Sequence, residues 1–490
     1  MRWLTLRGPC ALPRCVAGIQ SSLNAPGTVG SNVRGSRTLI PFIQREFNLS
    51  MATVYPFRAW RYNPSAVRLE DVVTQPYDKI SPAMQQAYYQ RSPYNLVRII
   101  LGLPELFDAE RGESVYTRAA RDFSAWKEQG VLVQEKTPCI FAYAQRFRVP
   151  GTGIVKERRG FIALGKLHDY SEQVVFRHEH TLSGPKSDRL NLLKATHAHF
   201  GQIFMLYSDP ARSVESILYD GAGPAEAEVT DEYGVQHRIW RISDPATIRL
   251  LTTAMADKKL IIADGHHRYE TALNYSREHA PAAPAPSERV TSQLPQPPYP
   301  EAAVMMTFVN MDSEGLVILP THRVVHSLAG FQPEIFSRNA QAWFTVDPLP
   351  AAETSSYLEQ LSAQPGTAFV AVTRTGALLL RARPEATAEL AALPEPQRKL
   401  DLSFLHTIVL DRLLGLDAEK VREQTNIRYL RDAAEAVDQV RRGEADVAFL
   451  TNPVPMEQLR EVAFAGSVMP QKSTDFYPKL LSGLAIYALE

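Results

Sequence analysis

The stretch of sequence that most constrains the fold is KLIIADGHHRYETAL, residues 259–273. Its first half is a short apolar run that ends at Asp264, which favours a buried strand. Its second half spaces Tyr269, Ala272 and Leu273 as one face of a helix, and Gly265 stands at the corner between the halves. The stretch therefore predicts a strand, a tight turn and a helix, and it places the chain in the mixed α/β class.

The turn at Gly265 has the chemistry of an anion-binding site. The first backbone N–H groups of a helix point outward at such a turn, and the helix dipole adds partial positive charge there. His266, His267 and Arg268 add side-chain donors, so we predict that the turn binds phosphate or a nucleotide. Asp264 is a candidate proton acceptor and a candidate Mg²⁺ ligand. The alternative is an ordinary Asp-Gly turn followed by histidines that only cap or pack.

A second basic segment spans residues 178–190. Ser187 or Asp188 can cap a helix, which puts Lys186 at a helix start and predicts a second phosphate-binding residue.

Glu179 lies upstream in the same segment, between His178 and His180. One chemistry makes Glu179 the general base that activates a hydroxyl for attack on a phosphoryl group. The other uses His178 and His180 with His266 or His267 as metal ligands of a hydrolase. We favour the base, because basic residues at helix starts suit anionic ligands better than zinc. A plain surface carboxylate is the third interpretation of Glu179.

Near the C-terminus, residues 468–479 contain Lys472 and Lys479 with Ser473 and Thr474 between them. These four side chains are candidate ligands of phosphate oxygens, and the alternative is a loop that exposes its lysines to water.

Two further basic positions are candidate substrate-binding sites. Residues 95–101 predict a buried strand that includes Arg98, and residues 319–325 form a short basic segment with His322 and Arg323 beside an apolar strand. The alternative for the second segment is a loop with a solvated arginine.

The composition limits the classes of partner. The chain has 490 residues with 53 basic and 53 acidic side chains, so no dedicated nucleic-acid surface is expected. No apolar run approaches the roughly 20 residues that span a bilayer, so no membrane partner is expected. Cys10, Cys15 and Cys139 form no C-x-x-C motif or disulfide framework, which fits a cytoplasmic protein. The sequence leaves the oligomeric state open.

Residues 1–50 differ from the rest, because six arginines precede the first acidic residue, Glu46. That is the composition of an organelle transit peptide. We favour a start assigned too early, with folded sequence beginning at Met51, because prolines and glycines break any amphipathic helix in this leader. Either interpretation predicts disorder.

From about residue 52 to the C-terminus, the sequence resembles the bacterial and archaeal family called domain of unknown function 1015. The matching segments are residues 56–59, 75–78, 95–98, 178–181, 184–186, 263–268, 319–323 and 469–479. The family name implies no activity.

A shorter resemblance concerns residues 264–268 and the His-Glu segment upstream of them, which are similar to the signature of the ParB/sulfiredoxin fold and of free serine kinases built on it. This resemblance implies that Glu179 is the base acting on a serine hydroxyl, and that Asp264 positions the hydroxyl or Mg²⁺. It also implies that His266, His267 and Arg268 hold the transferring phosphate. The sulfiredoxin cysteine is replaced by His266, which argues against sulfinic-acid repair.

The expected organisation is a ParB/sulfiredoxin-like core with additional α/β elements on both sides. The expected regions are an N-terminal α/β region at 51–150, the catalytic core at 151–330 with a proline-rich insertion at 280–300, and a C-terminal α/β region at 331–490.

The expected function is a small-molecule phosphotransferase, a kinase of free serine or a similar hydroxylated metabolite that uses ATP or ADP and Mg²⁺. The alternatives are a ParB-like regulator that binds a nucleotide without transferring phosphate, and a metal-dependent hydrolase.

Overall fold

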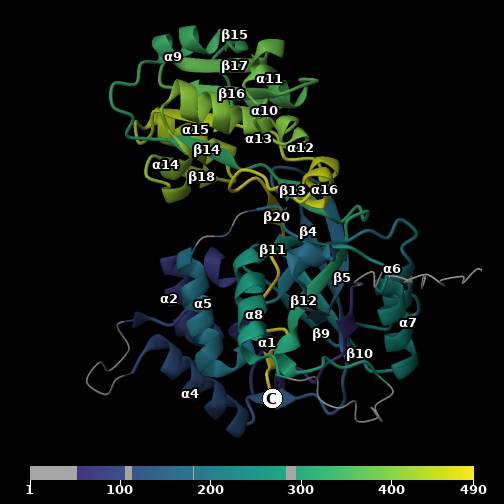
Figure 1. Ribbon diagram of the computed structural model, residues 1–490. Helices are drawn as coiled ribbons and strands as arrows, with labels where there is room; N and C mark the ends of the chain where they lie inside the picture. Colours follow the sequence, from purple (N-terminus) through teal and green to yellow (C-terminus); the bar gives the residue numbers. More distant parts are fainter. Residues whose placement is uncertain (1–51, 105–112, 180, 182, 283–293) are drawn as a thin grey trace, which may run out of the picture. The chain divides into compact units, whose positions relative to one another are not determined.

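The strand, turn and helix predicted at residues 259–273 are present in the computed structural model (Figure 1). Strand β11 (Leu260–Asp264) leads through Gly265 into helix α8 (His266–His279). Gly265 has a φ of +92°, which glycine adopts at no steric cost, so the chain turns sharply there. The structure describes residues 52–104, 113–179, 181, 183–282 and 294–490. The predicted α/β class is confirmed.

β11 belongs to a sheet with nine strands in the described part of the chain, in the order β6-β11-β8-β12-β5-β4-β10-β9, with β1 also paired to β5. β11 is parallel to β6 and antiparallel to β8. The strands are β1 (Val54–Tyr55), β4 (Ile140–Arg148), β5 (Val155–Lys166), β6 (Val175–Phe176), β8 (Ile203–Tyr207), β9 (Ala227–Thr230), β10 (Gln236–Ile242) and β12 (Ala303–Asn310).

Helices and short strand pairs surround this sheet. The helical elements are α1 (Leu69–Val72), η1 (Tyr77–Lys79), α2 (Pro82–Arg91), α3 (Val97–Ile100), α4 (Val115–Glu128), η4 (Tyr170–Glu172), α5 (Ser183–Thr196), α6 (Ser213–Tyr219), α7 (Pro245–Met255) and η5 (Pro300–Ala302). The paired strands are β2 (Trp60–Tyr62) with β3 (Leu132–Gln134), and β7 (Ala198–His199) with β21 (Tyr487–Ala488).

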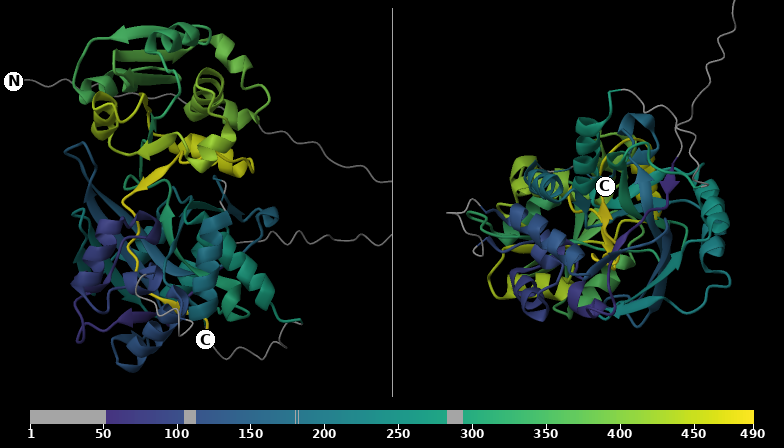
Figure 2. Two further views of the ribbon diagram at one scale, coloured as in Figure 1. Left: turned by 90° about the vertical axis from the view of Figure 1, so that its left-hand side faces the viewer. Right: turned by 90° about the horizontal axis from the view of Figure 1, so that it is seen from below.

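Successive side chains along each strand point to opposite faces of the sheet, and both faces are apolar. In β5, Phe161 and Ala163 belong to a cluster with apolar side chains of α6, α7 and α8. Ile162 and Leu164 point to the opposite face, which they share with apolar residues of the C-terminal segment. Figures 1 and 2 show that segment in yellow, running back along the sheet. The residues after Asp475 are therefore part of the core.

A second sheet has six strands in the described chain, in the order β15-β17-β16-β19-β14-β18, and β13 pairs with β20 beside it. The strands are β13 (Val317–Leu319), β14 (His322–Val325), β15 (Phe344–Leu349), β16 (Ala368–Thr373), β17 (Gly376–Ala382), β18 (Ile427–Leu430), β19 (Val447–Leu450) and β20 (Asp475–Tyr477). The helical elements are α9 (Pro333–Ala340), α10 (Thr354–Ser362), α11 (Pro384–Ala388), α12 (Glu395–Arg398), α13 (Asp401–Phe404), the π-helical η6 (Leu405–Leu413), α14 (Ala418–Glu423), α15 (Ala433–Arg441) and α16 (Met456–Phe464).

Two local predictions are wrong. Residues 95–101 form a turn and the short helix α3 rather than a strand, because the Asn95 side chain accepts a hydrogen bond from the backbone N–H of Val97 at 3.0 Å and starts a helical turn. Helix α5 begins at Ser183, before the predicted caps Ser187 and Asp188, so Lys186 lies inside its first turns.

Some predictions concern residues outside the described ranges. These are the leader, most of the proline-rich insertion (283–293) and His180. The predicted boundary at residue 150 falls between β4 and β5, which pair with each other in the nine-stranded sheet. Among the described helices, none has the length and apolar character to cross a bilayer.

Because β5 and β12 lie so close together, we predict that an alanine substitution at Gly160 destabilises the fold more than one at Gly153. A Cβ on Gly160 would lie 2.3 Å from the Phe308 carbonyl oxygen, so Gly160→Ala should destabilise the fold by about 2 kcal/mol through overpacking. Gly153 has no such neighbour within 4 Å, so Gly153→Ala should change stability by less than about 0.5 kcal/mol. Urea unfolding measures both, and equal stabilities would contradict the β5–β12 register.

Candidate functional site

A cavity of about 360 Å³ lies beside β20 and the residues that follow it. Among the described residues that line it, four are cations and two are carboxylates: Lys79, Arg431, Lys472, Lys479, Asp231 and Asp475. We call it the lysine cavity. Its volume is within the range of small-molecule sites, and its charge suits an anion.

The buried Arg158 of β5 holds one end of the segment that lines this cavity. Its guanidinium donates to the carbonyls of Tyr477 (3.3 Å) and Pro478 (2.5 Å) and to the side-chain oxygen of Gln145 (3.0 Å). Gln145 in turn donates to the Lys479 carbonyl at 2.8 Å. Burial lowers the pKa of Arg158 to about 10, so the group remains a cation at neutral pH. Three consecutive carbonyls are thereby fixed.

Arg323 of β14 holds the other end. It is buried, donates to the carbonyls of Thr321 and of Lys472 (3.0 Å), and packs against the Tyr429 ring. Burial lowers its pKa to about 10. The neighbouring His322 accepts a hydrogen bond from the Thr451 N–H at 3.3 Å inside the core. Both residues, predicted to bind substrate, make contacts within the protein behind the lysine cavity.

Asp264 connects the predicted turn to this cavity. One of its oxygens lies 3.2 Å from Arg268 Nη2, and the other lies 3.9 Å from Lys479 Nζ. Burial alone would raise the pKa of Asp264, but the charges of Lys479 and Arg268 outweigh it and lower that pKa. Asp264 is therefore an ionised partner of two cations and a weak proton acceptor.

Lys479 and Lys79 complete this charged cluster. Lys479 Nζ also lies 3.1 Å from Asp475, and although burial would lower the pKa of Lys479, the Asp264 and Asp475 carboxylates raise it. Burial and the charge of Lys479 lower the pKa of Lys79. Arg431 Nε bonds the other side of Asp475 at 2.5 Å.

The predicted turn itself is covered by its own arginine. Arg268 donates to the Gln202 carbonyl, and a Cβ on Gly265 would lie 2.9 Å from Arg268 Nη2. The guanidinium therefore folds back over the turn, next to the position where an incoming anion was expected.

His178 and His266 form a buried pair with fixed tautomers. His178 lies 2.7 Å from the Ile262 carbonyl through Nδ1 and 2.7 Å from the Thr474 hydroxyl through Nε2. Since the carbonyl only accepts, Nδ1 carries the proton and Nε2 accepts from Thr474. His266 Nε2 accepts from the His178 backbone N–H at 3.4 Å. Burial lowers the pKa of both histidines, so both are neutral.

This arrangement does not fit the proposed metals. Both ring nitrogens of His178 are engaged, His180 is outside the described residues, and the described residues contain no cluster with metal-ligand geometry. The two oxygens of Asp264 face cations, which does not fit a Mg²⁺ ligand.

Glu179 is half-buried next to this histidine pair. Its charge acts on His178, on Arg323 and on Tyr429, and Tyr429 lines the lysine cavity. Glu179 itself is not among the lining residues. The structure thus brings Glu179 and Asp264 to the same part of the molecule, around His178.

Lys186 of α5 and His267 of α8 lie close to each other, since the charge of Lys186 acts on His267. Lys186 pairs with Glu270, which also accepts from the Thr181 hydroxyl at 2.7 Å. Burial, together with the charges of Lys186 and Lys472, lowers the pKa of the half-buried His267. The charge of Lys186 is therefore balanced by Glu270.

Two other residues predicted to bind ligands, Ser473 and Arg98, donate hydrogen bonds to backbone carbonyls of the protein instead. The Ser473 hydroxyl donates to the Pro470 carbonyl at 2.5 Å. Arg98 donates to the Tyr89 carbonyl at 2.8 Å and packs on the Tyr89 ring, away from the lysine cavity, so it joins α2 to α3.

Sequence reasoning missed Lys79, Arg431 and Asp475 as site residues, and Arg158 and Gln145 as their supports. Lys79 directly follows the matching segment 75–78, which is a signal that could have found it. Asp475 lies within the predicted basic segment 468–479. We find no sequence signal for Arg158 or Gln145.

A family model described as "Protein of unknown function (DUF1015)" matches residues 54–403. No curated protein matches the sequence. Among solved structures, the chain is similar to a mutant free serine kinase in complex with ADP at 12% identity and a TM-score of 0.33, over 67% of this chain and 92% of that one. It is also similar to a free serine kinase in complex with AMP (12%, TM-score 0.30, 62% and 83%) and to a conserved hypothetical protein from Pyrococcus furiosus (12%, TM-score 0.29, 62% and 87%).

The lowered pKa of Asp264 predicts acid-dependent stability. The carboxylate stabilises the fold fully above its unfolded value of 3.8, and this contribution is lost as the pH falls towards the lower folded value. Asp264→Asn should cost about 3 kcal/mol at neutral pH, because Lys479 and Arg268 lose a partner, and the difference from wild type should shrink below pH 3.8. Urea unfolding across this range measures it. The exposed Asp220→Asn is the control, and a pH-independent difference would contradict the ion-pair role.

Proposed function

This chain belongs to the family described as "Protein of unknown function (DUF1015)", and we propose that it is a small-molecule phosphotransferase whose lysine cavity binds the phosphates of a nucleotide. The observation that supports this is the convergence of Lys79, Lys472 and Lys479 on one cavity. Among the described residues, no carboxylate forms an ion pair with Lys79 or Lys472, whereas Lys479 is matched by Asp264 and Asp475. A phosphate would supply the missing counter-charge.

The finer proposal is that ATP or ADP is the donor, that the acceptor is free serine or a similar hydroxylated metabolite, and that the protein works in the cytoplasm. Glu179 takes the proton of the acceptor hydroxyl. The hydroxyl oxygen bonds to the terminal phosphorus, and the bond to the bridging oxygen breaks, so a nucleotide shorter by one phosphate leaves. Lys79 and Lys472 offset the negative charge on the transferred group.

The second candidate is a regulator that binds a nucleotide in the same cavity without transferring phosphate. One observation favours it: among the described residues, the carboxylates at this cavity already have partners. Asp231 contacts Gln75 and His237, and Asp475 pairs with Arg431 and Lys479. Asp264 is paired with two cations, and Glu179 is not among the described lining residues.

Removal of one unpaired cation should weaken nucleotide binding. Lys472→Gln and Lys79→Gln should each raise the Kd for ATP or ADP about tenfold, because a charge-assisted hydrogen bond to phosphate is lost. Isothermal titration calorimetry measures the change. Lys399→Gln, on the exposed surface near α12, is the matched control. Unchanged affinity in both cavity variants would remove the lysine cavity as the nucleotide site.

Glu179→Gln separates the two candidates. If Glu179 is the base, the variant should lose about a hundredfold or more in kcat while its Kd for the nucleotide stays the same. A coupled assay of nucleotide turnover with a panel of hydroxylated amino acids measures it. Tight binding by the wild type without turnover selects the regulator, and turnover that survives Glu179→Gln rejects Glu179 as the base.

A further inference from the structure

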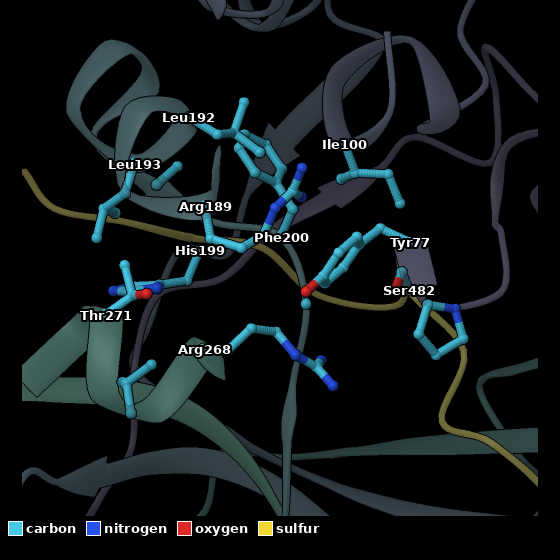
Figure 3. A pocket seen from close by; sticks show the side chains of 14 residues that line it. Tyr77, Ile100, Arg189, Leu192, Leu193, His199, Phe200, Arg268, Thr271 and Ser482 are labelled. Carbon is cyan, nitrogen blue, oxygen red and sulfur yellow. The ribbon is translucent and has the colours of Figure 1, made fainter. Parts of the chain in front are cut away.

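A second cavity, of about 60 Å³, is lined in part by Arg268 and shares no lining residue with the lysine cavity (Figure 3). Its walls come from α3, α5, α8 and β7, with Tyr77 of η1 and Ser482 of the C-terminal segment. We call it the Thr271 cavity. Since Asp264 pairs with both Arg268 and Lys479, this carboxylate connects the walls of the two cavities.

The charged residues of the Thr271 cavity are both cations. Arg189 and Arg268 line it, and its described lining contains no carboxylate. Arg189 stacks on the Tyr77 ring at 4.1 Å and pairs with Asp188 through Nε and Nη2. Arg268 uses Nη1 for Gln202 and Nη2 for Asp264. Because a guanidinium has five N–H donors, each arginine keeps donors for a further acceptor.

The side chain of Thr271 also indicates that this cavity holds a ligand. Its side chain is 5% exposed and lines the cavity, yet its hydroxyl has no hydrogen-bond partner among the described residues. A helical threonine ordinarily bonds a carbonyl of the preceding turn, and a buried hydroxyl without a partner is unfavourable. A ligand atom in the cavity would satisfy it.

The remaining walls indicate the size and polarity of that ligand. Ile100, Leu192 and Leu193 contribute apolar side chains to the lining. Burial lowers the pKa of His199 to about 4, so this wall residue is neutral at pH 7 and offers one N–H and one acceptor. The volume admits only a few non-hydrogen atoms.

We propose that the Thr271 cavity is a separate binding site for a small carboxylate with a short aliphatic part. Arg189 and Arg268 hold the carboxylate, Thr271 bonds one of its oxygens or an adjacent hydroxyl, and the aliphatic part packs on the leucines. The inference does not depend on phosphoryl transfer, because it rests on residues that the lysine cavity does not use.

The test is calorimetric titration of the full-length protein with sodium lactate and sodium propionate, with the uncharged lactamide as the probe of charge. The wild type should bind the two carboxylates and not the amide. Thr271→Val removes the hydroxyl at nearly constant volume and should weaken lactate binding about fivefold, and Arg189→Gln should weaken it about tenfold. Thr252→Val, in α7, is the matched control, because that hydroxyl bonds its own helix at 3.0 Å.

Thermal unfolding without ligand shows that the variants fold. Thr271→Val should be at least as stable as the wild type, since it loses an unpartnered buried hydroxyl, and it should lose the stabilisation that lactate gives. Lys472→Gln should leave lactate binding unchanged. No binding of either carboxylate, or lactate binding that is unchanged in both Thr271→Val and Arg189→Gln, overturns the proposal without affecting the lysine cavity.

Discussion

Two buried guanidinium groups, those of Arg158 and Arg323, are the constraint on which the candidate site depends. In the described part of the chain neither forms an ion pair, although both stay charged at neutral pH. A buried cation is tolerated only when hydrogen bonds replace its water, and here backbone carbonyls of residues 471–479 supply most of them. Release of this segment would therefore remove more than half of the hydrogen bonds that hold these two buried cations.

Part of this arrangement could be predicted from local sequence. The strand, turn and helix around Gly265 follow from hydrophobic periodicity and one glycine, and Lys472 and Lys479 stand out as basic residues in a polar segment. The roles of these residues in binding stay predictions. The strand expected at residues 95–101 failed because a short apolar run does not distinguish a strand from a helical turn, and Asn95 decided between them through one side-chain hydrogen bond.

The remainder depends on contacts between residues far apart in sequence. Arg158 and Tyr477 are separated by 319 positions, and in sequence Arg158 is only one of several charged residues at the start of β5. Lys79 lies near Lys479 only because the C-terminal segment returns along the sheet (Figure 2). Likewise, Arg268 looked available for phosphate, but its side chain turns back onto Gly265 and Gln202. The local sequence pattern identifies charged residues, but it does not show which of them are already paired with residues elsewhere in the chain.

The way the C-terminal segment is held has an evolutionary consequence. The segment is held by hydrogen bonds to its backbone carbonyl oxygens, which every amino acid possesses. The donors are the side chains of Arg158, Gln145 and Arg323. Replacing the side chain of Lys472 therefore leaves these hydrogen bonds in place, since they use its carbonyl, whereas replacing Lys479 would also leave Asp264 and Asp475 without a shared cation. A side chain such as that of Lys472, which lines the lysine cavity, could therefore vary among relatives while the main-chain support of the segment stays the same.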